Sequence, residues 1–327
     1  METDNSLAKY AKLFTKLRRD YRNGGAPHKP VLLLSVLQLI ERSDISSNRI
    51  YISPELVAAF RENWNSLVTS PKHVANFALP FFHMRSEPFW ELFAKPGMEI
   101  AVTKSNSIRS FKNLKATLDY AQIDQELWIL LNEPVARVLL RDTLLDTYFP
   151  ASKAKFSSKQ YELFVSQLSN ELLEESSNDY KSKIENLKTK LDEEAYEEEL
   201  FIRGGAFKKT IPRIYENTCC VSGLCVDATI SASMIDACHI IPFSTSHDDT
   251  IQNGIALCPN LHRAFDRGLI AIDTDYKVLV SSSFIEGSDS TYSIKQFEGS
   301  QIFLPRNDKY RPSSESLNWH LKECFVR

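Results

Sequence analysis

The residues best suited to chemistry lie in the last third of the chain. His239 is followed 14 positions later by Asn253, and Asn253 is followed nine positions later by His262. Asp266 stands four positions after His262, so these two side chains share one face if the segment is helical. Hydrolysis of a phosphodiester needs a base for the attacking water, a group that orients this base, and ligands for a divalent cation. The four residues supply these groups and indicate a metal-dependent phosphodiesterase.

Short elements must position these side chains. The apolar run 238–240 has the composition of a strand, so we expect His239 to project from a strand end. Asn253 precedes Gly254 in an expected turn, where its amide or carbonyl can hold His239 in one orientation. The segment 261–266 has helical spacing and presents its histidine and its aspartate together. A strand, a turn and a helix therefore converge on one site.

The order of these motifs resembles that of the HNH nuclease superfamily. The chain carries a cysteine followed by Ser-Gly at 220–223, HIIP at 239–242, NGIAL at 253–257 and LHRAFDRGLIAID at 261–273. The resemblance extends over residues 200–327. It implies a ββα-metal nuclease domain that hydrolyses DNA.

The resemblance also assigns roles within the site. It implies that His239 is the general base, that Asn253 orients this base, and that His262 binds the metal ion. Asp266 falls where many HNH enzymes have a second ligand from the helix. The implied cofactor is one divalent cation, either Mg²⁺, Mn²⁺ or another transition metal ion.

Cys238 departs from the family pattern. Many HNH sites carry Asp or His directly before the base, and that residue binds the metal, but here the position holds a thiol. Mg²⁺ prefers oxygen ligands, so a thiolate suits it poorly. Either Asp236 or water completes the coordination, or the site uses a softer cation such as Zn²⁺, Mn²⁺ or Ni²⁺. We favour the interpretation that Cys238 is a small buried apolar residue, and we include Asp236 among the expected metal ligands.

A structural zinc ion is not expected. Many HNH domains hold zinc with two CxxC pairs, but Cys220 and Cys225 are separated by four residues. Leu261 stands where the second cysteine of the later pair would be. Cys219, Cys220, Cys225 and Cys258 are the remaining candidates for a four-cysteine site, and we favour packing without zinc.

The N-terminal region has no comparable catalytic constellation, and we expect it to bind DNA. Segments 26–34 and 79–84, together with Phe89 and Trp90, resemble the sulfur-binding domain of McrA-like, modification-dependent restriction enzymes. That domain binds phosphorothioate DNA, and the resemblance covers residues 5–150. Sulfur in place of a phosphate oxygen is larger, more polarisable and poorly hydrated, so a shallow apolar pocket favours it.

The resemblance implies a pocket with a cationic rim and an apolar wall. It places His28 and Lys29 at the cationic rim. Leu79 and Pro80 would form the apolar wall, and His83 would lie next to this wall. Arg22 is a further candidate for DNA binding, because the segment 9–29 is strongly basic. The family often has arginine near 29, an aromatic residue near 79 and a small residue near 83. Because of these differences, we expect the domain to bind either phosphorothioate weakly or another modification. For His28 and Lys29, a position at the start of a core helix is an equally good interpretation.

The composition is that of an ordinary globular protein, with 43% hydrophobic and 25% charged residues. The net charge of −3 gives no support to nucleic-acid binding, which depends on how charge is distributed. No apolar run approaches the roughly 20 residues that cross a bilayer, and the N-terminus lacks the features of a signal peptide. We therefore expect a cytoplasmic protein. All six cysteines follow residue 218, and in a long chain for which no signal peptide is expected we do not expect a secreted disulfide framework.

We expect an α+β protein in three parts: a mainly helical DNA-binding domain at 1–150, a helical connector at 151–200 and a nuclease domain at 201–327. The predicted function is that of a type IV-like restriction endonuclease acting on modified double-stranded DNA, with phosphorothioate as the expected modification. Cleavage of both strands with one site per chain predicts a homodimer, and the segment 155–200 is the expected dimer element. The alternatives are a nuclease for methylated or unmodified DNA, and a DNA-binding regulator with an inactive HNH fold.

Overall fold

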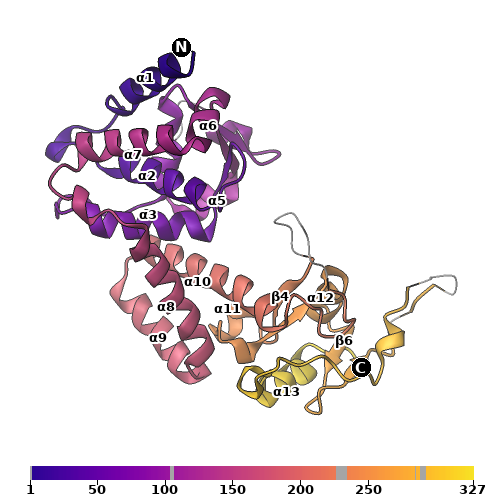
Figure 1. Ribbon diagram of the computed structural model, residues 1–327. Coiled ribbons are helices and arrows are strands. Elements are labelled where there is room, and N and C mark those ends of the chain that lie inside the picture. Colours follow the sequence, from indigo (N-terminus) through magenta and orange to yellow (C-terminus); the bar gives the residue numbers. More distant parts are fainter. Residues whose placement is uncertain (1, 104–106, 226–233, 284, 288–291) are drawn as a thin grey trace. The chain divides into compact units, whose positions relative to one another are not determined.

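The computed structural model describes the whole chain except residues 1, 104–106, 226–233, 284 and 288–291. The described residues form helices and short antiparallel strands, which confirms the expected α+β class (Figure 1). They divide into an N-terminal unit, residues 1–164 with 191–202, and a C-terminal unit, residues 165–190 with 203–327. No described helix is both long and apolar enough to cross a bilayer.

The N-terminal unit is built around one buried helix, α2 (His28–Glu41). Its sequence is apolar on nearly every side, and all of its residues from Lys29 to Ile40 are buried. Such a helix must be covered all round, and α3, α4, α6 and α7 pack against it (Figure 1). The other helices of this unit are α1 (Glu2–Phe14), α3 (Pro54–Leu67), α4 (Ala78–His83), α5 (Phe111–Thr117), α6 (Gln125–Asn132) and α7 (Pro134–Tyr148).

A small antiparallel sheet completes the N-terminal unit. Its strands are β1 (Arg49–Tyr51), β2 (Trp90–Ala94) and β3 (Leu118–Ile123), with β3 in the centre. Ala121 is buried and lies opposite Ile50 on one side and Leu92 on the other. Because β2 follows α4 closely, the sheet fixes one end of the segment that carries the predicted apolar wall.

The segment predicted as a connector, residues 151–200, is helical. It does not form a separate part, because its helices are divided between the two units. It comprises α8 (Ser158–Glu174), α9 (Ser177–Lys190) and the first part of α10 (Glu193–Ile214). The segments 158–164 and 191–202 group with the N-terminal unit, whereas 165–190 groups with the C-terminal unit. The helix α9 buries Tyr180 and Ile184, so it contributes to a core. Periodicity predicted these helices, but the assignment of each helix to a unit depends on packing with distant segments.

The C-terminal unit contains two antiparallel strands followed by a helix. Strand β4 (Asp236–His239) pairs with β5 (Gly254–Leu257), and α12 (Pro259–Asp266) packs against both. Proline suits the first turn of α12, where the backbone N–H has no partner within the helix. The remaining elements of this unit are α11 (Phe243–Ser246), β6 (Ile270–Ile272), β7 (Val278–Val280) and α13 (Ser314–Glu323). This arrangement is the predicted ββα fold.

Two glycines of the long motifs have clear structural reasons. A Cβ atom on Gly254 would lie 2.4 Å from Cδ1 of Ile211 and 2.9 Å from the ring of Phe207, so α10 packs directly on the start of β5. Gly268 ends the turn after α12 with φ +65°, and a Cβ atom there would lie 1.9 Å from the carbonyl oxygen of Cys324. Both glycines keep the strands and the helix in close contact with their neighbours.

Candidate functional site

His239 stands at the end of β4 and is held on two sides. Its Nε2 lies 2.8 Å from Oδ1 of Asp249, and its ring stacks on Phe207 with centroids 3.9 Å apart and an interplanar angle of 10°. A carboxylate only accepts hydrogen bonds, so Nε2 carries the proton and Nδ1 keeps its lone pair. The side chain of His239 is 22% exposed, so the imidazole is oriented and still accessible.

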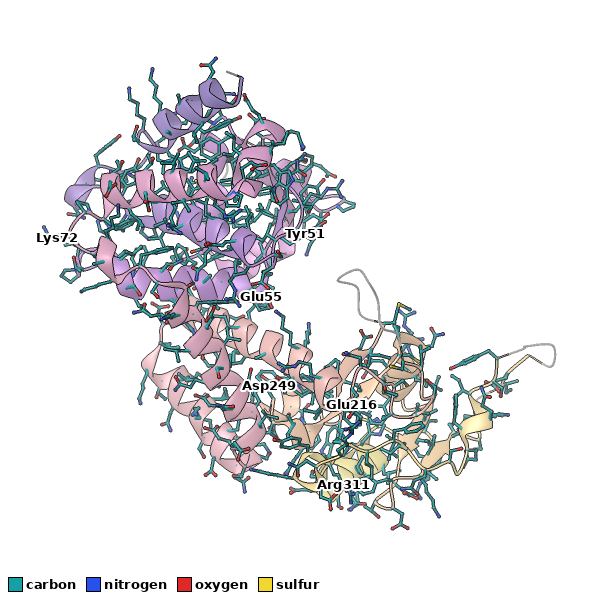
Figure 2. The ribbon with its side chains drawn as sticks, viewed as in Figure 1. Tyr51, Glu55, Lys72, Glu216, Asp249 and Arg311 are labelled. Atoms are coloured by element: carbon teal, nitrogen blue, oxygen red, sulfur yellow. The ribbon has the colours of Figure 1, made fainter. Side chains whose placement is uncertain are left out.

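Asp249, labelled in Figure 2, is the acceptor that sequence reasoning missed. Its side chain is 2% exposed, and its second oxygen accepts a hydrogen bond of 3.2 Å from the hydroxyl of Tyr180 on α9. Burial raises the pKa of Tyr180 well above its usual range, so this hydroxyl remains a donor. The neighbouring Asp248 accepts a hydrogen bond from Ser177 at the start of α9. The available signal was the acidic pair ten positions after His239, between the first two motif residues.

Asn253 acts on the loop that follows His239. Its Oδ1 accepts from the N–H of Ile241 at 2.9 Å, and its Nδ2 donates to the carbonyl oxygens of Ile241 at 2.9 Å and Asp248 at 3.0 Å. All its side-chain hydrogen bonds to the described residues lie within the loop 241–248. We expected the amide or carbonyl of Asn253 to orient His239; its side chain holds the loop 241–248, which directly precedes Asp249, and Asp249 is the acceptor at Nε2 of His239.

Three side chains on β4 and α12 could hold one metal ion. Ligand atoms of Cys238, His262 and Asp266 all lie within 4.8 Å of one another, and no other such group occurs among the described residues. Nε2 of His262 lies 3.5 Å from Oδ2 of Asp266, and Sγ of Cys238 lies 3.9 Å from Oδ1 of the same carboxylate. The set offers one sulfur, one nitrogen and one oxygen, which fits a divalent transition cation.

Asp236 lies on the other side of His262. Its Oδ2 is 3.3 Å from Nδ1 of His262, and it stands two residues before Cys238 on β4, on the same side of the strand. The predicted ligand Asp236 therefore lies beside the three-atom cluster and contacts one of its members. An acceptor at Nδ1 leaves Nε2 free to bind a metal.

Cys238 is fully buried, as expected for a small apolar residue. Burial raises the pKa of its thiol well above the usual range, and the carboxylate of Asp266 adds to this effect. Its sulfur nevertheless faces the two helix-borne ligands. The position is thus both part of the core and part of the candidate metal site.

The other described cysteines of the C-terminal unit are not members of this three-residue cluster. Cys219 and Cys258 form a close pair, and a hydrogen bond from the Cys258 thiol lowers the pKa of Cys219 to about 5. Cys220 is fully buried, and its backbone N–H donates to the carbonyl oxygen of Ala256 on β5. Cys225 is exposed. The four cysteines that were the remaining candidates for a zinc site thus have different surroundings.

The six residues predicted to bind DNA line one cleft of the N-terminal unit. The cleft has a volume of about 1620 Å³ and opens beside the start of α2 and the helix α4. Its lining includes the predicted Arg22, His28, Lys29, Leu79, Pro80 and His83, and adds Arg18, Arg19, His73 and Arg85. Residues from three separate sequence segments therefore meet at one concave surface.

Lys29 and His28 differ from the predicted cationic rim. Lys29 is buried, forms an ion pair with Glu87 and donates a hydrogen bond of 2.7 Å to Ser86. Burial lowers the pKa of Lys29, and its charge is balanced inside the protein. His28 donates from Nε2 to the carbonyl oxygen of Val74 at 2.9 Å, and burial lowers its pKa below the usual 6.5. The sequence did not show these two partners, because they lie 58 and 46 residues away.

Exposed arginines supply positive charge at this cleft instead. Arg18 and Arg22 are exposed, and Arg22 forms an ion pair with the exposed Asp20 at its side. Leu79 is half-buried and Pro80 is buried, so an apolar surface lies beside these cations. The cleft combines apolar and cationic groups, as the predicted pocket does.

The match to a known protein family falls on the C-terminal site. Residues 219–273 match the HNH endonuclease family, and this range contains β4, β5 and α12. Among solved structures, a protein described as a modification dependent TagI restriction endonuclease is similar, with 20% sequence identity and a TM-score of 0.27. That similarity covers 36% of this chain and 36% of the other chain. No curated protein matches the chain.

Proposed function

We propose that this protein, which carries an HNH endonuclease domain at residues 219–273, is a metal-dependent restriction endonuclease for modified double-stranded DNA. One observation carries the proposal. His239, which Asp249 orients, is the residue directly after Cys238 in the sequence. Cys238 belongs to the three-residue cluster with His262 and Asp266. An oriented base and a cation site on one ββα element supply what hydrolysis of a phosphodiester needs.

His239 takes the proton of the attacking water on Nδ1. The water oxygen then forms a bond to phosphorus, and the bond from phosphorus to the leaving 3′ oxygen breaks. Asp249 stabilises the imidazolium that forms, because its carboxylate already accepts the hydrogen bond from Nε2. Stacking on Phe207 keeps the ring in one plane throughout.

The metal ion would be held by His262 and Asp266, with Cys238 as the third group of the cluster. When bound, it would supply positive charge to the phosphate and to the leaving oxygen. Asp236 would hold His262 in one orientation through Nδ1.

The cleft of the N-terminal unit is the proposed site for the modified backbone. Leu79 and Pro80 give it an apolar surface that suits a poorly hydrated sulfur atom. Arg18 and Arg22 lie at the same cleft and would contact neighbouring phosphates. Phosphorothioate DNA is the substrate that matches this combination of an apolar surface and exposed cations.

The proposal also covers the oligomeric state and the cellular compartment of the enzyme. One nuclease site per chain suits a homodimer in which each copy cuts one strand. The proposed compartment is the cytoplasm. Light scattering that shows a monomer, both alone and on DNA, would exclude the dimer.

The test uses matched plasmids with and without phosphorothioate, incubated with the full chain in Mg²⁺, Mn²⁺, Co²⁺ and Zn²⁺. We expect cleavage of the modified plasmid alone, and loss of about 10²- to 10⁴-fold in rate with His239→Ala, the usual contribution of a general base. Equal cleavage of both plasmids would retain the nuclease and exclude sulfur recognition. Binding of modified DNA without cleavage in any of these cations would favour the DNA-binding regulator.

A further inference from the structure

The candidate metal site contains an unusual donor for a cation that works on phosphates. Two of its ligands, His262 and Asp266, come from one face of α12, and the third is the thiol of Cys238 on β4. The sulfur is fully buried, so its place is fixed by the packing of the strand on the helix. The nature of this third ligand decides which cations the site prefers.

The distances suit coordination of one ion. Metal–ligand distances of about 2.0 to 2.3 Å in a tetrahedral site place ligand atoms roughly 3.3 to 3.8 Å apart. Nε2 of His262 is already 3.5 Å from Asp266, and Sγ of Cys238 is 3.9 Å from Asp266. Since all three ligand atoms lie within 4.8 Å of one another, closure around an ion needs shifts of roughly one ångström.

The surroundings of Cys238 favour a role as a metal ligand over a role as a core residue alone. A thiol that only fills the core would face apolar groups, whereas this sulfur faces a carboxylate that is 58% exposed. Asp236 lies at Nδ1 of His262, 3.3 Å away, and leaves Nε2 on the side of Asp266. A carboxylate behind a ligating histidine is a common supporting arrangement in metal sites.

We infer that Cys238 is a metal ligand and makes this site selective for zinc-like divalent cations over Mg²⁺. The inference rests on the proposed nuclease function and names the cation class of that same site. Mg²⁺ requires nearly octahedral oxygen coordination, which one sulfur, one nitrogen and one carboxylate do not provide. Zn²⁺ and Co²⁺ accept all three donors, and a coordinating thiol binds them as thiolate. Three protein ligands leave a position for a phosphate oxygen or water.

The direct test is cobalt spectroscopy on the metal-free full chain. Co²⁺ bound to a thiolate gives a sulfur-to-cobalt charge-transfer band in the near ultraviolet, which is independent of nuclease activity. We expect this band after addition of one equivalent of Co²⁺, its loss in Cys238→Ser and Cys238→Asp, and its retention in Cys225→Ser. Cys225 is exposed and outside the cluster, so its replacement is the matched control. Zn²⁺ should abolish the band, and an excess of Mg²⁺ should leave it unchanged.

Calorimetry measures the selectivity itself. In Cys238→Asp, we expect Zn²⁺ affinity to fall about 100-fold or more, since supporting partners alone cost about 10- to 100-fold, while Mg²⁺ affinity rises. Near-ultraviolet circular dichroism and the thermal unfolding midpoint verify that each variant is folded. If Cys238→Ala binds Co²⁺ as tightly as the wild type, and neither shows the band, the ligand role of Cys238 is overturned while the nuclease proposal stands. If the folded wild type binds no divalent cation, both proposals are overturned.

Discussion

The carboxylate of Asp249 lies 2.8 Å from Nε2 of His239, and its other oxygen accepts a hydrogen bond from Tyr180. His239, the proposed base, is thus connected to α9, a helix about 60 residues earlier in the chain. The order Tyr180, Asp249, His239 places a buried donor behind the acceptor that orients the imidazole. This connection gives α9, which the sequence suggested as part of a connector and dimer element, a contact with the candidate site.

We predict that Asp249→Asn lowers the rate of DNA cleavage by about 100-fold or more. Asparagine keeps the shape of the side chain, but it cannot stabilise the imidazolium and can reverse the hydrogen bond, which favours the wrong tautomer. Single-turnover cleavage of the modified plasmid under saturating enzyme measures the effect. Asp275→Asn, at an exposed position, is the matched control and should cleave at the wild-type rate.

We predict that Tyr180→Phe has a smaller effect of the same kind as Asp249→Asn. It removes one hydroxyl and keeps the buried ring, so we expect a smaller loss of cleavage rate and a loss of about 1 kcal/mol in the free energy of unfolding. A loss of rate in Tyr180→Phe that exceeds the loss in Asp249→Asn would contradict the order of the connection.

We predict that Asn253→Ala acts mainly on stability. The amide is buried and bonds to the backbone of Ile241 and Asp248, so its removal leaves buried polar groups of the loop without partners. The expected cost is about 2 to 4 kcal/mol in the free energy of unfolding, measured by urea denaturation. His239→Ala removes a partly exposed ring and should cost less. Equal stability of Asn253→Ala and the wild type, together with full loss of cleavage, would instead indicate direct action on the base.

The face shared by His262 and Asp266 could be predicted because their spacing is local and equals one helical turn. The roles of His239 and Asn253 were expected from the resemblance to HNH nucleases, and periodicity does not indicate them. Asp249 could not be assigned in this way. It lies in a loop whose path depends on the side chain of Asn253, and periodicity gives no information about such a path.

The same limit applies to the N-terminal unit. The sequence left two interpretations of Lys29, the start of a core helix or, by resemblance, the rim of a pocket; in the structure Lys29 is buried in α2 and also lines the cleft. The acid that balances its charge, Glu87, lies 58 residues later, and nothing local to either residue indicates the pair. Long-range pairing of this kind decides whether a lysine at a cleft is free to bind phosphate.

We predict that Lys29→Met destabilises the N-terminal unit. It leaves Glu87 buried without its cation, which costs about 3 to 5 kcal/mol for buried pairs. The double variant Lys29→Met with Glu87→Gln should recover much of this loss, because the remaining amide oxygen still accepts from the N–H of Arg18. A double-mutant cycle by chemical denaturation measures the coupling. Unchanged stability in Lys29→Met, with weaker DNA binding, would show that Lys29 is a DNA contact.

We predict the opposite pattern for Arg22→Ala. Its guanidinium is exposed and its pair with Asp20 lies on the surface, so stability should change by less than about 1 kcal/mol. Affinity for modified DNA should fall, and the slope of log affinity against log salt should decrease by about one. Fluorescence anisotropy over a series of salt concentrations measures both. Arg49→Ala is the control, because Arg49 is an exposed arginine of β1 that does not line the cleft. Equal salt slopes for the two variants would remove Arg22 from the DNA contacts.

The stability of the N-terminal unit should depend on pH through Glu198. Burial raises the pKa of this carboxyl from 4.5 to about 7, and its Oε1 accepts from the N–H of Phe77. Between these two values the folded chain binds more protons than the unfolded chain, so the free energy of unfolding falls as pH rises from about 4.5 to about 7. The difference between the two pKa values corresponds to about 3 kcal/mol, which is fully lost above pH 7.

Glu198→Gln keeps the acceptor for Phe77 and cannot ionise, so its stability relative to the wild type should increase by this amount between pH 4.5 and pH 8. Urea denaturation at several pH values measures both proteins, and parallel curves would show that Glu198 does not titrate in this range.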